Sequence, residues 1–140
     1  MKRLLLLLAL LAATFAECLA ESAGKGAKDR VEVIYFHGKK RCPTCMAIEK
    51  CSREVVERDF ARQKSEGKVV FRIVDISTKE GMKMAKDYRV TWSSLYVTVW
   101  QNGRERREDL TKFAFKTART KPDEFKRKLK SKVQAGLKDR

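Results

Sequence analysis

The sequence predicts an α/β fold in which a mixed sheet of four to five strands is sandwiched by helices. Patterns typical of buried strands alternate along the chain with patterns typical of amphipathic helices. Long helical connections between the first strands require parallel pairing, whereas the Asn102-Gly103 dipeptide predicts a tight turn between antiparallel strands. A chain of 140 residues has room for one such domain and little room for a second core.

Residues 1–20 have the pattern of a bacterial secretory signal peptide. Lys2 and Arg3 precede an apolar run over residues 4–11, and small residues follow it. The run is well short of the ~20 residues that a membrane-spanning helix needs. We therefore expect export to the periplasm or cell envelope. Two alternatives to simple cleavage stay open: retention as a membrane anchor, and lipidation at Cys18, which a poor lipobox precedes.

The domain is predicted to cover residues 31–140, after a flexible linker over residues 21–30 whose composition is small and charged. Its first strand, residues 31–36, is rich in β-branched and aromatic side chains, which suits burial on both faces. A helix is predicted from Pro43 to just before Gly67, because proline favours the first turn and apolar residues then recur at helical spacing.

The rest of the chain continues the alternation. Residues 68–76 predict a second, mostly buried strand, residues 79–89 a short amphipathic helix and residues 95–100 a third strand. Beyond the Asn-Gly turn we expect a fourth strand near residues 108–115. The last helix is predicted to begin with Thr120 as its N-cap and to bury apolar residues at every fourth position, Phe125, Leu129, Val133 and Leu137.

A Cys-Pro-Thr-Cys motif, residues 42–45, lies between the first strand and the helix after it. Disulfides persist outside the cytoplasm, so in an exported protein the pair is a redox centre or a structural staple. Cys42 falls at the helix N-terminus, where the helix dipole favours a thiolate, and Arg41 with the two preceding lysines adds positive charge. Cys42 is therefore the predicted nucleophile. Cys45, one turn further on, is the predicted resolving thiol.

The motif's position, the downstream strand and hairpin, and the terminal helix resemble the thioredoxin fold over nearly the whole mature chain. The stretch V-I-Y-F-H-G-K-x-R-C-x-T-C-M-A-I-E-K is also similar to exported bacterial thioredoxin-like proteins of the ArsF family, named as nitrophenyl-compound nitroreductase subunits. We carry over the fold and not the named activity. The resemblance implies a redox-active Cys42–Cys45 disulfide with no organic cofactor, in which Pro43 and Thr44 tune the reduction potential.

Two departures from the thioredoxin pattern concern the surroundings of the motif. The family has a cis-proline before the third strand, where this chain has Trp92, Ser93 and Ser94. A non-proline cis bond costs about 2.5 to 4 kcal/mol, so we expect a trans loop and a reshaped substrate-docking edge, with Trp92 as a docking platform. Many members also carry a buried acid in the strand before the motif, and here the strand's single acid is Glu32, near its start.

Other interpretations of the cysteines stay open. The pair could form an inert disulfide or half of a metal site, although zinc usually takes four ligands and His37 and Cys51 are the available additions. Cys51 points ~120° away from Cys45 around the helix, which favours a small buried apolar residue over a regulatory thiol. His37 either assists Cys42 or is an ordinary loop residue. We predict no metal.

The basic composition of the chain limits the kinds of binding partner that we expect. The chain has 33 Lys and Arg against 18 Asp and Glu, a formal net charge of +15, which attracts acidic partners. The last helix has a basic face that is either solvated or associated with a membrane surface, and its residues are Lys126, Arg127, Lys128, Lys130, Lys132 and Lys138. Exposed aromatic residues for base stacking are missing from this face, so we expect no nucleic acid partner.

The leading hypothesis is an exported thiol-disulfide oxidoreductase, a monomer that acts on protein or small thiol and disulfide substrates and exchanges electrons with an unidentified redox partner. The main alternative is a non-catalytic thioredoxin-like accessory subunit that docks a partner through the loop at Ser93 and Ser94. A small metal-handling protein is the third. The sequence favours the enzyme because the motif combines a helix N-terminus with neighbouring basic residues.

Overall fold

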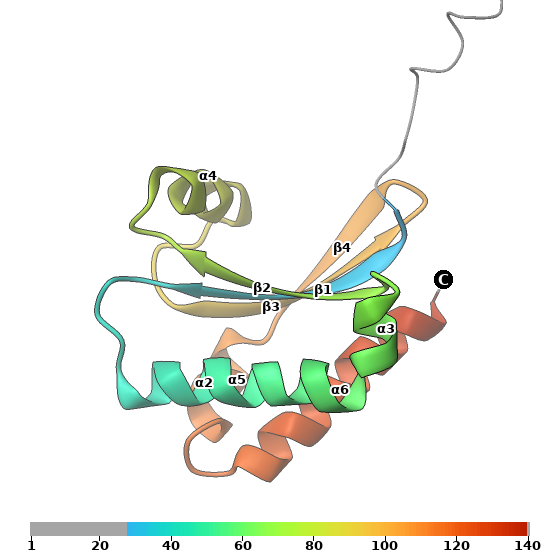
Figure 1. Cartoon of the computed structure of the whole chain (residues 1–140). Helices are drawn as coiled ribbons and strands as arrows, with labels where there is room; N and C mark the ends of the chain where they lie inside the picture. Colours follow the sequence, from blue (N-terminus) through green and yellow to red (C-terminus); the bar gives the residue numbers. More distant parts are fainter. Residues whose placement is uncertain (1–27, 140) are drawn as a thin grey trace, which may run out of the picture.

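The computed structural model describes residues 28–139 (Figure 1). The predicted signal peptide, Cys18 and most of the predicted linker lie outside these residues. A four-stranded sheet in the order β2-β1-β3-β4 forms the centre. The strands are β1 (Arg30–His37), β2 (Val69–Asp75), β3 (Ser94–Gln101) and β4 (Arg104–Asp109). β1 pairs with β2 in parallel and with β3 antiparallel, and β3 pairs with β4 antiparallel, so the predicted mixed sheet is confirmed with four strands.

Helices lie on both faces of the sheet. The segments are α2 (Pro43–Glu54), the π-helical turn η1 (Val55–Asp59), α3 (Ala61–Ser65), α4 (Lys79–Tyr88), α5 (Thr111–Thr117) and α6 (Pro122–Lys138). In Figure 1, α2, α5 and α6 cover one face and α4 lies on the other. Within residues 28–139, no helix combines the length and the apolar character that crossing a membrane would require.

β1 is one of the two interior strands and is buried on both faces, as its sequence predicts. Every residue from Val31 to Phe36 is buried. Val33 and Tyr35 contribute to the core beneath α2 and α6, whereas Ile34 and Phe36 contribute to the smaller core beneath α4. The residues after His37 therefore leave a strand that is paired on both sides and packed on both faces.

Two expectations about the neighbouring strands are wrong. β2 is not mostly buried: only Val69 and Val74 along it are buried, because β2 is an edge strand with a neighbour on one side. β3 is not parallel to the first two strands. The ten-residue helix α4 stays at the end of the sheet where β2 leaves, and β3 enters from that same end (Figure 1). The chain therefore runs back antiparallel beside β1.

The expected strand at residues 108–115 is also wrong. Asn102 and Gly103 form the predicted turn, both with positive φ (52° and 74°), and the pairing Gln101↔Arg104 starts β4 directly after it. β4 ends at Asp109, whose Oδ1 accepts a hydrogen bond from Thr111 N–H at 2.8 Å. The helix α5 follows because apolar residues recur at every fourth position, Leu110, Ala114 and Ala118, and all three are buried.

α6 packs its predicted apolar stripe on the sheet, although its start differs from the expectation. Phe125, Leu129 and Val133 are buried and Leu137 is half-buried. The N-cap is Lys121 and not Thr120, whose hydroxyl instead donates to the Lys116 carbonyl at 3.2 Å. Near its C-terminal end α6 approaches the sheet closely at Gly136, where a Cβ atom would lie 2.7 Å from a Val99 methyl group.

Candidate functional site

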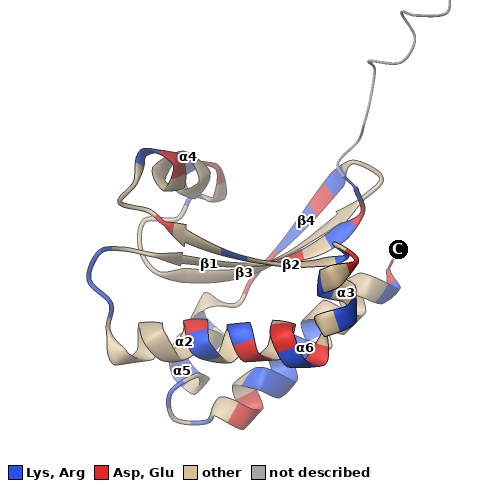
Figure 2. Cartoon of the chain, viewed as in Figure 1, with Lys and Arg blue, Asp and Glu red and all other residues tan. Residues whose placement is uncertain are grey.

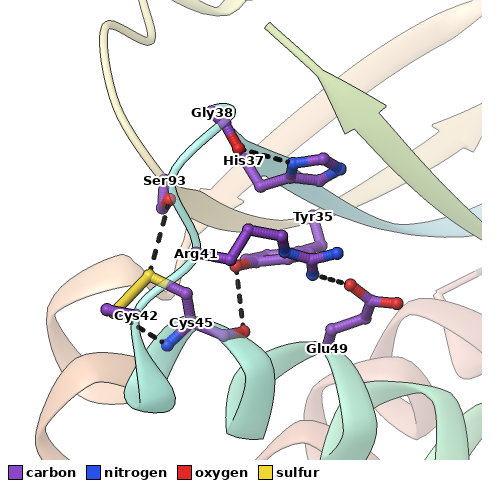
Figure 3. The surroundings of a disulfide bond; sticks show 8 residues. All are labelled: Tyr35, His37, Gly38, Arg41, Cys42, Cys45, Glu49 and Ser93. Atoms are coloured by element: carbon purple, nitrogen blue, oxygen red, sulfur yellow. Dashed lines mark hydrogen bonds and ion pairs between the residues drawn. A yellow bond between two sulfur atoms is a disulfide. The ribbon is translucent and has the colours of Figure 1, made fainter.

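The cysteine motif lies at the junction that the sequence predicts, after β1 and at the start of α2. Cys42 is the N-cap of α2 with extended backbone (φ −77°, ψ 160°), and Pro43 occupies the first helical turn. Cys42 and Cys45 form a disulfide, with their Cα atoms 5.0 Å apart (Figure 3). Thr44, between them, is half-buried.

The two sulfur atoms have different surroundings. Cys42 is exposed, whereas Cys45 is only 5% exposed. The Cys45 backbone N–H donates to Cys42 Sγ at 3.1 Å, and the first turn of α2 carries no acidic residue. Unpaired N–H groups and the dipole at a helix N-terminus stabilise negative charge. The geometry therefore suits Cys42 as an accessible thiolate and Cys45 as a protected second thiol, the roles that the sequence predicts.

The loop that joins β1 to α2 is basic, as Figure 2 shows, and it leads directly into Cys42. Arg41 forms an ion pair with Glu49 of α2, and its guanidinium lies 5.9 Å from the centre of the Tyr35 ring. Lys39 and Lys40 are exposed, and neither makes an ion pair within residues 28–139. The loop thus adds positive potential near Cys42 from the exposed Lys39 and Lys40, whereas the Arg41 charge is partly neutralised by Glu49.

Tyr35 lies beneath the motif and was missed by the sequence analysis. Its ring is fully buried, and its hydroxyl donates to the Cys45 carbonyl at 2.9 Å. Burial raises the pKa of Tyr35 above its ordinary value, and the nearby Arg41 charge opposes this. The phenol is therefore neutral and a hydrogen-bond donor across the physiological range. The sequence signal for Tyr35 is the alternation of side chains along β1, which places every second residue, including Tyr35, on the face that α2 covers.

Ser93 is the loop residue that reaches the disulfide. Its Oγ lies 3.7 Å from Cys45 Sγ, within hydrogen-bonding range for sulfur. Figure 3 shows the Ser93 side chain directed at the cysteines from a chain segment separate from β1 and α2. Because Cys45 is almost inaccessible to water, Ser93 is the hydroxyl positioned to exchange a proton with its thiol in the reduced state.

The three residues of the predicted docking loop lie in three different environments. Ser93 faces the disulfide, while Ser94 is buried and donates to the Trp92 carbonyl at 3.1 Å. Trp92 is 59% exposed, and its ring stacks on Phe115 of α5 with the centroids 5.1 Å apart. No peptide bond is cis among residues 28–139, so the loop is trans as expected.

His37 is not brought to the sulfur atoms. Its Nδ1 lies 3.0 Å from the Gly38 carbonyl, its ring lies 5.9 Å from that of Tyr35, and in Figure 3 it points away from the cysteines. His37 is the last residue of β1, paired with Asp75 of β2, and so belongs to the end of the strand and not to the loop.

Cys51 lies apart from the pair and belongs to the core. It is 6% exposed, its Sγ lies 3.9 Å from the Ala118 carbonyl, and burial raises the pKa of its thiol. This is the buried apolar role that the sequence favours. In the part of the chain that the structure describes, no three His, Cys, Asp or Glu side chains group as metal ligands.

Glu32 is distant from the motif, at the opposite end of β1. It is 3% exposed and is neutralised by Arg30 Nε at 2.6 Å and Arg72 at 3.7 Å. No carboxylate is therefore buried beneath Cys45 among the described residues. The β1 side chain that contacts the Cys45 backbone is Tyr35, through its hydroxyl.

Comparison with known proteins identifies the fold. No family model matches the chain, and no curated protein matches it. The structure is similar to the solution structure of a thioredoxin from Thermus thermophilus, with a TM-score of 0.50 and 23% identity over 76% of each chain. A second structure, described as a malarial protein, aligns at a TM-score of 0.38 and 20% identity over 61% of this chain and 92% of that one, too low a score to support an argument. The fold is thioredoxin-like.

Proposed function

We propose that this protein is a thiol-disulfide oxidoreductase that cycles Cys42 and Cys45 between a dithiol and a disulfide. The observation that carries the proposal is the asymmetry of the pair. An exposed sulfur caps α2 and accepts a helix N–H at 3.1 Å, and a sulfur only 5% exposed lies one turn behind it. This arrangement favours attack at Cys42 and resolution from Cys45.

In the reducing direction, the Cys42 thiolate attacks one sulfur of a substrate disulfide. A bond forms between Cys42 Sγ and that sulfur, the substrate S–S bond breaks, and the departing substrate thiolate takes a proton from water. Cys45, as its thiolate, then attacks Cys42 Sγ. The bond between Cys42 Sγ and the substrate sulfur breaks, and that sulfur leaves as a thiolate, which takes up the proton that Cys45 lost. The protein is left as the disulfide seen in the structure.

In the oxidising direction, the same steps run backwards. A substrate thiolate attacks Cys42 Sγ, the Cys42–Cys45 bond breaks, and Cys45 leaves as a thiolate that must gain a proton. The substrate's second thiolate then forms the substrate disulfide and releases Cys42. In both directions a proton moves at Cys45, and the Ser93 hydroxyl at 3.7 Å supports a role for Ser93 in that transfer.

The proposal also includes the protein's location, its oligomeric state and its partners. Export to the periplasm or cell envelope, an anchor at Cys18, the monomeric state and an unidentified redox partner rest on the sequence pattern alone. The ArsF-family relationship rests on the stretch from Val33 to Lys50, and the nitroreductase naming is not part of the proposal. The substrates are thiols and disulfides of proteins or small molecules.

A non-catalytic accessory subunit is the second candidate. Two observations favour it: Trp92 is 59% exposed in the loop whose Ser93 reaches Cys45, and no carboxylate is buried beneath Cys45 within residues 28–139. Such a subunit would keep the disulfide and bind a partner through Trp92, with no turnover. The two functions differ in turnover, because only the oxidoreductase reduces substrate disulfides repeatedly.

The test is reduction of insulin disulfides by the full chain with dithiothreitol as the electron source. We expect turnover by the parent protein, loss of activity in Cys42→Ser and retention in Cys51→Ala. The Cys51 variant is the matched control because it removes a buried thiol that faces Ala118 and not the disulfide. Activity that survives Cys42→Ser, or a parent protein no faster than dithiothreitol alone, would overturn the proposal in favour of the accessory subunit.

A further inference from the structure

A groove of about 500 Å³ opens between the loop after α4 and the start of α5. Its apolar walls include Val90, Trp92 and Phe115, and the stacked Trp92 and Phe115 rings form one continuous surface. Arg89 and Lys112 contribute the basic groups of its lining. The groove therefore combines an aromatic platform with two cationic side chains.

The groove and the disulfide lie on opposite sides of one short loop. Trp92 and Ser94 line the groove, and Ser93 between them has its Oγ 3.7 Å from Cys45 Sγ. A polypeptide joined to Cys42 by a mixed disulfide can therefore cross the loop and enter the groove with the residues that flank its own cysteine. An extended chain covers ~3.3 Å per residue, so neighbouring side chains in the substrate reach both places.

The cationic groups of the groove are available to a ligand. Arg89 and Lys112 are exposed, and neither makes an ion pair among residues 28–139. By contrast Arg107, on β4 and outside the groove, is paired with Asp87 and Glu105. The groove's acid, Asp109, accepts hydrogen bonds from Thr111 N–H at 2.8 Å and the Tyr96 hydroxyl at 3.2 Å. The groove's lining thus holds two exposed cations that make no ion pair among residues 28–139 and one carboxylate that already has hydrogen-bond partners.

Arg89 also occupies a backbone position that arginine does not favour. It ends α4 in the left-handed region, with φ 55°, and its N–H donates to the Lys86 carbonyl at 3.1 Å. Glycine or asparagine is the usual residue at such a helix end. Arginine there fixes a long cationic side chain at the mouth of the groove, at some cost in backbone energy.

We propose that the groove binds an acidic segment of a protein substrate, with an apolar side chain on Trp92 and Phe115 and carboxylates at Arg89 and Lys112. The inference rests on the proposed function and names its substrate class. Lys39 and Lys40, exposed on the loop before Cys42, extend the same preference to the other side of the disulfide. The substrate's disulfide exchanges with Cys42 by the steps given above, and the groove orients it.

The experiment uses two synthetic peptides, each closed by one disulfide and carrying one phenylalanine, with flanking glutamates in one and flanking lysines in the other. The reduced protein is mixed with each peptide, and the second-order rate of protein oxidation is measured at low and high salt. We expect the acidic peptide to react about tenfold faster at low salt, with the difference shrinking as salt screens the charges.

Matched variants distinguish the effect of the groove on the peptide preference from the effect of the overall charge of +15. Lys112→Glu and Lys128→Glu change the net charge equally, but Lys128 is an exposed residue of α6 outside the groove. We expect Lys112→Glu to remove most of the preference and Lys128→Glu to keep it. Trp92→Ala should slow both peptides, because it removes the aromatic platform.

The outcomes are distinct. Equal rates for the two peptides, or equal losses in Lys112→Glu and Lys128→Glu, would overturn the substrate class and leave the oxidoreductase function standing. A reduced protein that reacts with neither peptide, nor with glutathione disulfide, would overturn both proposals.

Discussion

Ser93 and Tyr35 give the buried sulfur of Cys45 its polar surroundings. Ser93 approaches Sγ at 3.7 Å from the loop before β3, and the Tyr35 hydroxyl donates to the Cys45 carbonyl at 2.9 Å from β1. The two residues differ in what they do. Ser93 faces the reacting atom and can exchange its proton, whereas Tyr35 holds the first turn of α2 on the sheet.

Replacing Ser93 by alanine should slow resolution and leave the first attack unchanged. We expect release of a mixed disulfide at Cys42 to slow roughly tenfold near neutral pH, less than the ~10²–10⁴-fold of a strong general base, because a serine hydroxyl is weakly basic. Stopped-flow decay of a chromogenic mixed disulfide measures this step. Ser131→Ala, on the exposed face of α6, is the control. Equal decay rates in the two variants would contradict the role of Ser93.

Replacing Tyr35 by phenylalanine should lower stability in a pH-dependent way. Loss of the buried hydrogen bond costs about 1 kcal/mol of unfolding free energy. Burial raises the pKa of Tyr35 above the value of 10.0 expected in the unfolded chain. The folded state therefore holds this proton more tightly. The contribution of this proton to the free energy of unfolding is fully present below pH 10 and is lost as the pH rises through the folded-state pKa of Tyr35.

Urea unfolding at pH 7 and at pH values above 10 measures the Tyr35 effect. The gap between the parent protein and Tyr35→Phe should narrow at the higher pH, since phenylalanine has no proton to lose. A gap that stayed constant or widened would contradict the direction of the pKa shift.

At the scale of elements, local periodicity predicts the structure where one pattern is strong. Residues 31–36 and Pro43 onward became β1 and α2, because a continuous β-branched run and a proline-led apolar stripe each favour one conformation. The sequence pattern does not predict β4 at its true position, because Arg104–Asp109 is a charged edge strand with little apolar signal. The direction of β3 depends on where α4 packs, which is tertiary information.

The close contact of α6 with the sheet can be tested at Gly136. A Cβ atom there would lie 2.7 Å from one Val99 methyl group and 3.0 Å from one of Val31, both on stiff β-branched side chains. We expect Gly136→Ala to be destabilising, since overpacking costs about 1–3 kcal/mol and the better helix propensity of alanine returns at most about 1 kcal/mol.

Thermal unfolding of Gly136→Ala, with Ser131→Ala as a control in the same helix, measures the cost of that contact. The control should have a melting temperature at or slightly above that of the parent protein, because Ser131 is exposed and alanine is the better helix former. A Gly136→Ala protein as stable as the parent would mean that α6 can move away from β1 and β3 without cost.

At the scale of the whole molecule, the sequence predicts the thioredoxin-like fold and the cysteine pair, but only part of the pair's surroundings. Cys42 and Cys45 are neighbours in the chain, so a local pattern is enough to find them. Ser93 lies 48 residues from Cys45, and its contact with the sulfur depends on how β3 enters the sheet. The distinct roles of Trp92, Ser93 and Ser94 in one loop likewise depend on tertiary packing.

The whole fold also determines how the site meets its surroundings. β1 is an interior strand of the sheet, and the basic loop after it leads to the disulfide at the start of α2. The exposed Arg89 and Lys112 line the groove beside the loop that carries Ser93. The structure thus joins an exposed cysteine at a helix N-terminus to a surface with basic side chains. Both features act in the same direction, since each favours an anion at Cys42.

The rate of Cys42 alkylation as a function of pH, in the reduced full chain, tests this account most directly. Peptide mass spectrometry separates Cys42 from the other three cysteines, so the pKa is assigned to one thiol. We predict a Cys42 pKa clearly below the ~8.5 of a free thiol, and a slower, higher-pH reaction at Cys51, whose pKa burial raises. A Cys42 thiol that titrates at or above the ordinary value would contradict the claim that α2 and its basic loop stabilise a thiolate there.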